Sequence, residues 1–175
     1  STVTPDIVTR LHEENNMVVY NPEFLTEQNA LEDFVNPPMH VFGGDKTHCH
    51  YLYQFYLDHS RCKDTTTRSY YLTPAEASFV KYGINSFLAS KVLWFNQFSD
   101  LCEKHNVKYN AVMNSMITDQ RIGNSHITVP GPDGRKGYGG ACFPKDTNAF
   151  SRFAEGDFSL LDLVIKAVSY THLRA

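Results

Sequence analysis

The longest stretch of mainly apolar positions in the chain has the pattern of a single long helix. Thr73–Glu76 supplies an N-cap, a proline at the first helical position and a glutamate that completes a capping box. No helix-breaking residue follows until His105–Asn106, which gives about 33 residues, or roughly 50 Å. Within Ala77–Ser99 only Lys81 and Lys91 are charged. Because a helix that is apolar on nearly all sides must be buried on most of them, we predict that it forms the core of a homodimer.

The pattern before this helix predicts a partial parallel sheet. Ser1–His12 is interpreted as a strand end, a turn and a short helix, and Met17–Tyr20 as a strand. Val41–Gly44 is interpreted as a second short strand closed by two glycines, and Lys46–Asp58 as a helix. Short apolar strands separated by roughly 20 residues are typical of βαβ units. Arg61–Ser69 is expected to be a polar connection.

Helices and one long loop are predicted after the long helix. Tyr109–Thr118 has a helical pattern, and Asn124–Gly140 is a loop rich in glycine and proline. Loops of this length are usually functional or disordered. Leu160–Val168 starts an apolar helix that is expected to stop almost at once. Residues 169–175 continue no pattern, and we interpret them as a non-native tail.

Composition excludes two classes of partner. With 175 residues, 42% hydrophobic and 20% charged, the chain can form one globular domain or the remains of two. A net charge of -3 gives no electrostatic basis for binding nucleic acid. A membrane span is excluded because four polar residues interrupt the apolar stretch: Lys81, Asn85, Lys91 and Asn96. Four cysteines without disulfide-like spacing predict a reducing compartment, the cytoplasm.

Cys142 is the candidate nucleophile. It follows a glycine turn, Gly137–Gly140, and precedes Pro144, which suits the start of a helix. The positive end of the helix dipole and the neighbouring Lys145 favour the thiolate, which is the nucleophilic form of cysteine. The alternative is a cysteine buried at a helix entry, where it acts as a small hydrophobic residue.

Two pairs of polar residues have the spacing of a site. Lys81 and Asn85 lie four residues apart on one face of the long helix, where they could stabilise an oxyanion. The alternative is a Lys81 whose ammonium extends to solvent. Glu23 and Glu27 follow the predicted strand directly, where α/β folds bind ligands, although ordinary acidic capping of a helix explains them too.

Two further patterns predict no site. His48–His50, with His59 and Cys62, matches no zinc spacing, so we expect no metal, and a metal-binding protein stays as an alternative. The sequence contains no Gly-x-Gly-x-x-Gly fingerprint for a dinucleotide.

Taken together, these stretches resemble the UDP-glucose 6-dehydrogenase family of nucleotide-sugar dehydrogenases. The matching stretches, in family order, are STVTP, YNPEFLTE, TPAEASFVKYGINSFLASKVLWFNQFSDLCEKH, DQRIG and VPGPDGRKGYGGACFPKDT. The resemblance implies an α/β remnant of a Rossmann-like NAD-binding domain, followed by an all-α central dimerisation domain with one long helix. We assign these domains to residues 1–64 and 65–168, and the non-native tail to 169–175.

The resemblance also implies a reaction and a role for each matching residue. The family oxidises the C6 alcohol of the sugar to a carboxylate with two NAD molecules. Cys142 would attack the intermediate aldehyde, giving a thiohemiacetal and then a thioester. Lys81 and Asn85 would stabilise the oxyanion, Asp146 would orient the water, and Glu27 would act as base. The residues implied for substrate binding are Glu23, Phe24, Leu25, Lys81, Asn85, Gly139 and Arg121, which reaches into the partner's site, and those for NAD are Thr2, Glu27 and Lys145.

UDP-glucose is the substrate that the resemblance favours, with GDP-mannose and UDP-N-acetylmannosamine as alternatives. The product, UDP-glucuronate, belongs to nucleotide-sugar metabolism and polysaccharide biosynthesis. Because the family's N-terminal half-domain and C-terminal domain have no counterpart in these residues, we expect the chain alone to be inactive. A non-catalytic helical dimerisation module is the alternative from another functional class.

Overall fold

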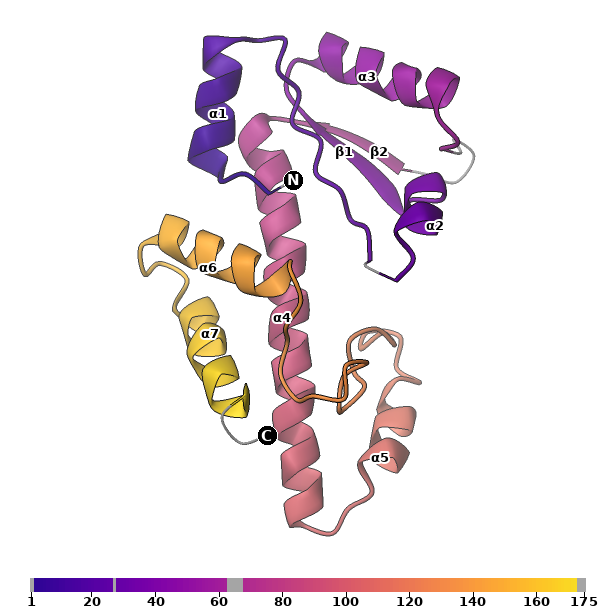
Figure 1. The fold of residues 1–175 in the computed structure, drawn as a ribbon, viewed down its shortest axis with the longest axis vertical. Coiled ribbons are helices and arrows are strands. Elements are labelled where there is room, and N and C mark those ends of the chain that lie inside the picture. The colour runs from indigo at the N-terminus through magenta and orange to yellow at the C-terminus, as the bar shows by residue number, and fades with distance from the viewer. Residues whose placement is uncertain (1, 27, 63–67, 173–175) are drawn as a thin grey trace. The chain divides into compact units, whose positions relative to one another are not determined.

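The computed structural model describes residues 2–26, 28–62 and 68–172, with side chains through Val168 (Figure 1). Its elements are α1 (Pro5–Glu14), α2 (Ala30–Val35), β1 (Met39–Gly43), α3 (Lys46–His59), β2 (Arg68–Leu72), α4 (Pro74–Lys104), α5 (Tyr109–Met116), α6 (Phe143–Ala154) and α7 (Ser159–His172). Contacts divide the chain into two compact units, Ser1–Gly83 and Ile84–Ala175, and the boundary falls within α4. The assignment of domains to residues 1–64 and 65–168 stays a prediction.

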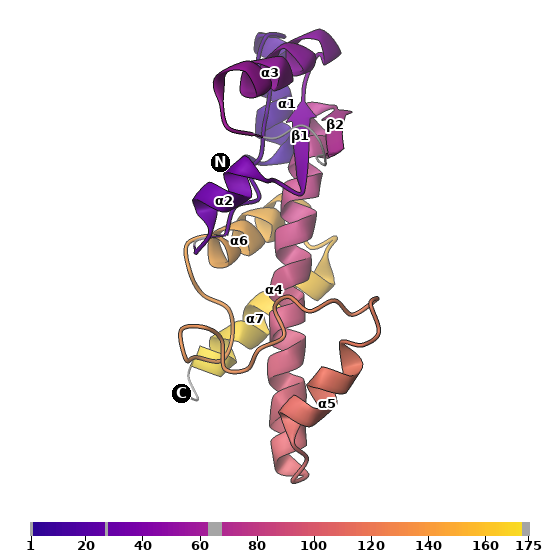
Figure 2. The ribbon, with the colours of Figure 1, turned by 90° about the vertical axis from the view of Figure 1, so that its right-hand side faces the viewer.

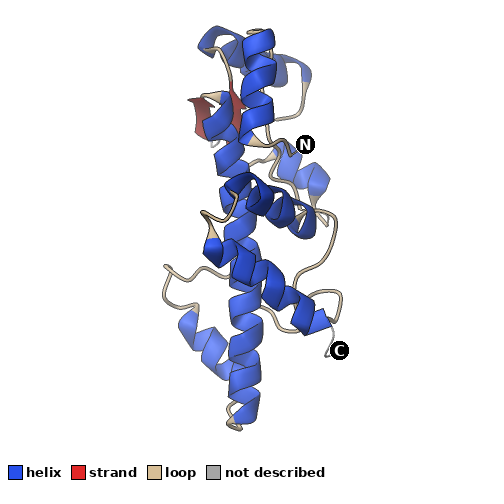
Figure 3. Ribbon diagram, turned by 90° about the vertical axis from the view of Figure 1, so that its left-hand side faces the viewer, coloured by secondary structure: helices blue, strands red, loops and turns tan. Residues whose placement is uncertain are grey.

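The first unit contains one βαβ unit. β1 and β2 pair in parallel from Met39 with Arg68 to Gly43 with Leu72, and α3 connects them (Figure 2). Both strands, red in Figure 3, belong to this unit. The predicted strand near Val41 and the predicted helix from Lys46 are therefore confirmed, which agrees with a partial Rossmann-like fold.

Three predictions about strands were wrong, and the first is the strand end expected before α1, since residues 2–4 form no strand. Met17–Tyr20 forms no strand, because only Tyr20 pairs, in a single antiparallel bridge with Gly43. The connection predicted to end at Ser69 instead contains the start of β2. The sequence of β2 shows no clear alternation, and its exposed Arg68 and Tyr70 give little local signal, so pairing with β1 defines the strand.

Gly43, the last residue of β1, packs against the start of α4. A Cβ atom added at Gly43 would lie 2.6 Å from the Cβ of Ala77 and 3.0 Å from the Cα of Pro74. Such distances are too short for any side chain, so only glycine lets the strand approach the helix this closely. The core of this unit contains Val8, Tyr20, Val41 and Ala77.

α4 begins and ends with the local signals expected from its sequence. Glu76 Oε2 accepts hydrogen bonds from the N–H and the hydroxyl of Thr73, both at 2.8 Å, so the predicted capping box is confirmed. The helix covers 31 residues. At its end Asn106 has a φ of 56°, and the N–H of Val107 donates to the carbonyl of Cys102. This is the pattern of a Schellman motif, which ends helices.

Among its described residues the second unit contains helices and one long loop between α5 and α6, and no strand. Its core contains Ala89 and Leu93 of α4, Tyr138 of the long loop and Val164 of α7. α6 and α7 pack together, and Ser151 donates to Asp162 between them. The prediction that the last helix stops near Val168 was wrong, since α7 continues to His172. Residues 173–175 lie outside the described residues, so the interpretation of 169–175 as a non-native tail stays a prediction.

Candidate active site

The cysteine lies at the helix start that the sequence predicts. Cys142 is the N-cap residue of α6, and its half-buried side chain makes no capping hydrogen bond. Gly137 and Gly140 have φ values of 92° and 74°, in the left-handed region that favours glycine. A Cβ atom added at Gly139 would meet no atom within 4 Å, so packing within the chain does not require glycine there.

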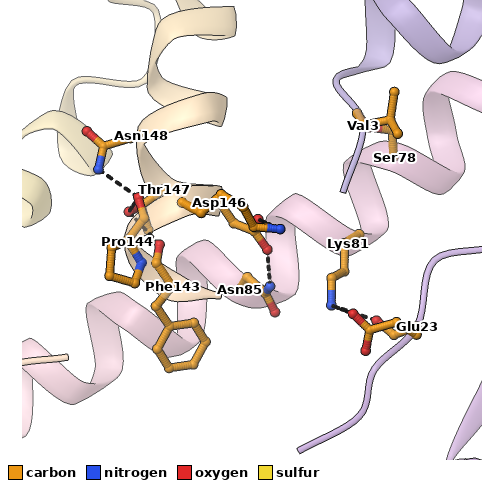
Figure 4. Close-up of polar contacts among 11 residues, drawn as sticks. Val3, Glu23, Ser78, Lys81, Asn85, Phe143, Pro144, Asp146, Thr147 and Asn148 are labelled. Atoms are coloured by element: carbon orange, nitrogen blue, oxygen red, sulfur yellow. Dashed lines mark hydrogen bonds and ion pairs between the residues drawn. The ribbon is translucent and has the colours of Figure 1, made fainter. Parts of the chain in front are cut away.

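Asp146 lies one helical turn after Cys142 and is completely buried. Asn85 of α4 donates through Nδ2 to Asp146 Oδ2 at 2.5 Å (Figure 4). Lys145 Nζ lies 3.2 Å from Asp146 Oδ1 as an ion pair, but Oδ1 accepts no hydrogen bond from the described residues. A buried carboxylate oxygen without such a bond is costly unless another group supplies one.

Lys81 is held in the first unit through the segment that contains Glu23. Its ammonium donates to the carbonyl oxygen of Glu23 at 2.6 Å and to Glu23 Oε1 at 3.3 Å (Figure 4). It also lies 5.3 Å from the centre of the Phe24 ring. The side chain of Lys81 is only 5% exposed, so the alternative in which its ammonium extends to solvent is wrong.

The pKa of Glu23 reflects opposing effects. Burial raises the pKa of Glu23, but the N–H of Leu25 and the Lys81 ammonium outweigh it, and the pKa is lowered. The surrounding segment is fixed by Asn21, which donates to the Val41 carbonyl at 2.7 Å and accepts from Tyr56 at 2.8 Å. The structure thus positions the backbone that presents Glu23, Phe24 and Leu25.

The remaining predicted residues lie in several parts of the chain. Thr2 is half-buried near the start of the chain, and Lys145 is exposed. Arg121 is exposed and bonds within its own turn to Asp119, at 3.0 Å from Nε to Oδ1. Its reach into a partner's site stays a prediction. Glu27 lies outside the described residues.

Two polar residues on α4 to which the sequence assigned no role hold segments next to predicted site residues. Lys91 donates to the carbonyl oxygens of Ile122 and Gly123, at 2.9 and 3.3 Å, and so holds the turn that follows Arg121. Burial lowers the pKa of Lys91. Asn96 accepts a hydrogen bond from the N–H of Gly137. The available signal was the one used to exclude a membrane span: polar residues that interrupt an apolar helix.

The other chemical patterns give no further site. Among the described residues no group of three or more His, Cys, Asp or Glu side chains could hold a metal ion. His48 and His50 instead bond to the backbone carbonyls of Asn16 and Lys46. In the same part of the chain, no helix combines the length and apolar character that crossing a membrane requires.

The chain is similar to known nucleotide-sugar dehydrogenases. The model of the family described as UDP-glucose/GDP-mannose dehydrogenase, central domain, matches residues 75–169. The chain is 35% identical to UDP-glucose 6-dehydrogenase of Rhizobium meliloti (strain 1021), over 95% of this chain and 38% of that protein. It is 36% identical to UDP-glucose 6-dehydrogenase YwqF of Bacillus subtilis (strain 168), over 85% of this chain and 32% of that protein. The chain thus spans about a third of the length of the curated relatives it matches.

Solved structures of other dehydrogenases also match this chain. A UDP-glucose dehydrogenase from Pyrobaculum islandicum matches with a TM-score of 0.72 and 35% identity, covering 88% of this chain and 33% of that one. A UDP-D-ManNAc dehydrogenase from Pyrococcus horikoshii has a TM-score of 0.78 at 20% identity, covering 98% of this chain and 41% of that one, and shows the fold alone. Because the family model matches more than half of its residues, the chain belongs to the UDP-glucose/GDP-mannose dehydrogenase family.

Proposed function

We propose that this chain carries catalytic residues of an NAD-dependent dehydrogenase that oxidises the C6 alcohol of UDP-glucose to the carboxylate of UDP-glucuronate. Membership of the family supports the class of reaction. The names of the curated relatives support UDP-glucose as substrate. We place the reaction in the reducing cytoplasm, where a catalytic thiol stays reduced; all four cysteines are free.

The observation that carries this proposal is the arrangement around Asp146. A fully buried carboxylate lies one turn from a cysteine, with one oxygen bonded to Asn85 and the other 3.2 Å from the Lys145 ammonium, without a hydrogen bond from the described residues. Such an oxygen can accept a hydrogen bond from a water that attacks a bond formed at the cysteine.

The cysteine divides the second oxidation into addition of the thiol, oxidation of the adduct and hydrolysis. Cys142 Sγ bonds to the aldehyde carbon while a proton goes to the aldehyde oxygen, which gives a thiohemiacetal. Oxidation of this adduct gives a thioester; water oriented by Asp146 then adds to it, the carbon–sulfur bond breaks, and the thiol and a carboxylate are released. When bound, NAD accepts the hydride in each of the two oxidations. Lys81 and Asn85 stabilise the oxyanion, and Glu27 acts as base.

Binding is assigned to residues that can supply suitable groups. We assign the sugar nucleotide to Glu23, Phe24, Leu25, Lys81, Asn85, Gly139 and to the partner subunit's copy of Arg121. We assign NAD to Thr2, Glu27 and Lys145. The exposed Lys145 ammonium, in the first turn of α6, fits an anionic ligand such as a dinucleotide.

We also propose that the protein is a homodimer formed through α4. Three apolar side chains of this helix are exposed in the second unit and lie seven residues apart: Phe87, Trp94 and Leu101, at 67%, 50% and 52%. We call them the apolar stripe of α4. Positions seven apart lie on one side of a helix, the spacing used where two helices pack along their length. A second copy, which presents the same stripe, is the partner that this spacing favours.

A chimera tests the proposed reaction. The aligned third of the Bacillus subtilis relative would be replaced by this chain, and NADH formation would be followed with UDP-glucose, GDP-mannose or UDP-N-acetylmannosamine. We expect activity with UDP-glucose, and we expect Cys142→Ser to reduce it by about 10³-fold or more. Cys102→Ser, at a buried cysteine of the same unit, is the matched control. A folded chimera without NADH formation, or an active Cys142→Ser chimera, would overturn the proposal.

A second candidate function, assembly without catalysis, is favoured by the apolar stripe of α4. Alkylation of Cys142 separates the two candidates. The enzyme requires an activated thiol, so Cys142 should react faster in the folded chain than in the urea-unfolded chain. Slower reaction in the folded chain would favour the assembly module, because the fold would then only shield the thiol from the reagent.

A further inference from the structure

Asn96 is a buried amide whose two ends bond to different segments of the second unit. It lies on α4 and is 1% exposed. Its Nδ2 donates to the Val92 carbonyl oxygen, one turn earlier on the same helix, at 2.6 Å. Its Oδ1 accepts the backbone N–H of Gly137 at 3.0 Å, across 41 residues of sequence. Both halves of the amide are thus satisfied, as a buried polar group requires.

The segment that Asn96 holds leads directly to the cysteine. Gly137 opens the stretch that ends at Cys142 and has a left-handed φ of 92°. The next residue, Tyr138, is 5% exposed and packs in the core with Ala89 and Leu93. Only Gly139, Gly140 and Ala141, all exposed, separate this anchored pair from Cys142.

Other polar contacts of the loop with α4, the ion pairs of Lys136 with Asp100 and with Glu103, are more open to water. Lys136 forms an ion pair with Asp100, but their side chains are 35% and 50% exposed. Exposed ion pairs contribute little to the stability of a fold because water and salt compete with them. The shielded hydrogen bond from Gly137 to Asn96 is therefore the polar contact that best fixes where the loop leaves α4.

We propose that Asn96 is a positioning residue for Cys142, acting through Gly137 to set the path of the loop and the placement of the thiol. This inference rests on the proposed role of Cys142 as the nucleophile. The bond to Gly137 requires a short side chain with an acceptor, and the asparagine amide also supplies a donor for the Val92 carbonyl. Leucine has neither, and an ionised aspartate keeps the acceptor for Gly137 but cannot donate to the Val92 carbonyl.

The test uses the full chain with Asn96→Leu and Asn96→Asp, and with Gln97→Leu at the exposed neighbouring position as matched control. Hydrogen exchange of the Gly137 amide is measured by NMR. Alkylation of each cysteine by iodoacetamide is followed by mass spectrometry over a range of pH, with buried Cys102 as internal reference. These readouts require no catalytic turnover, so they can fail independently of the proposed reaction.

We expect Asn96→Leu to speed exchange of the Gly137 amide by about tenfold, since a buried hydrogen bond is lost. The pH dependence of Cys142 alkylation should change with it, while Cys102 is unaffected. Asn96→Asp should restore much of the wild-type behaviour of both, and Gln97→Leu should match wild type. A folded Asn96→Leu variant with wild-type alkylation of Cys142 at every pH would overturn the proposal.

If the Asn96→Leu variant does not fold, a second measurement on the wild-type chain tests whether the bond to Gly137 positions the thiol. At low urea concentrations, exchange of the Gly137 amide and alkylation of Cys142 should change together, with the same dependence on urea, because one local opening releases both. Exchange of Gly137 that responds to urea while Cys142 alkylation stays constant would show that the bond does not position the thiol.

Discussion

At the scale of single residues, the ion pair of Glu23 and Lys81 joins a half-exposed carboxylate to a buried ammonium. The two side chains are 41% and 5% exposed. Lys81 also needs the Glu23 carbonyl oxygen, since a buried ammonium is costly without hydrogen-bond acceptors. The carboxylate therefore supplies the opposite charge, and the backbone carbonyl supplies the shorter hydrogen bond.

This pair predicts a specific pH dependence of stability. Burial raises the pKa of Glu23, but the Leu25 N–H and Lys81 outweigh it, so the folded-state pKa lies below its ordinary value of 4.5. A lowered pKa contributes stability above the ordinary value, and this stability is lost as pH falls through the folded-state pKa. We therefore expect Glu23→Gln to destabilise the chain at about pH 7 and to have a smaller effect at about pH 3.

Urea unfolding of wild type and variant at both pH values provides the measurement. Glu13→Gln, at an exposed glutamate in α1, is the control and should have little effect at either pH. An equal loss of stability at both pH values for Glu23→Gln would show that the charge of this carboxylate does not contribute.

At the scale of elements, polar side chains of α4 hold segments within each of the two units. Four side chains that interrupt its apolar pattern each bond to a different segment: Lys81 to Glu23, Asn85 to Asp146, Lys91 to Ile122 and Gly123, and Asn96 to Gly137. A helix fixes the spacing of its side chains, so α4 also fixes where these segments attach to it. The integrity of α4 thus matters to every attached segment.

The capping box predicts how α4 responds to a change at its start. Thr73→Ala removes the hydroxyl that accepts the Glu76 N–H at 3.3 Å and bonds the Glu76 carboxylate. We expect a loss of about 1 kcal/mol in the free energy of unfolding, the usual effect of losing an N-cap. Urea unfolding followed by circular dichroism measures it. Thr128→Ala, at an exposed loop threonine, should leave the free energy unchanged; a similar loss there would argue against capping as the cause.

At the scale of the whole molecule, the apolar stripe of α4 predicts the oligomeric state. Replacing Phe87, Trp94 and Leu101 with serine should convert the proposed dimer to a monomer, because the stripe would no longer supply apolar area to bury. Sedimentation velocity over a range of concentrations measures the change. The matched control is Leu163→Ser, since Leu163 of α7 is also exposed, at 63%. A triple variant that sediments as a dimer would contradict the assignment of this surface.

The parts of the fold that follow from local signals could be predicted from sequence. The N-cap at Thr73, the glycine turn before Cys142 and the helical pattern of α3 each depend on residues within a few positions of one another. The same reasoning failed for β2, because a strand with exposed side chains depends on its partner strand. It also failed at Met17–Tyr20, where an apolar, β-favouring pattern did not form a ladder.

The sequence by itself determined that this chain has a long capped helix, a cysteine at a helix start and the motifs of its family. Only the tertiary structure decided which distant segments Lys81, Asn85, Lys91 and Asn96 of α4 contact, since these partners lie 31 to 61 residues away in sequence. Local backbone preferences act over a turn or two, so they set where helices begin and end. Pairing over longer separations depends on how the chain packs, which no local pattern specifies.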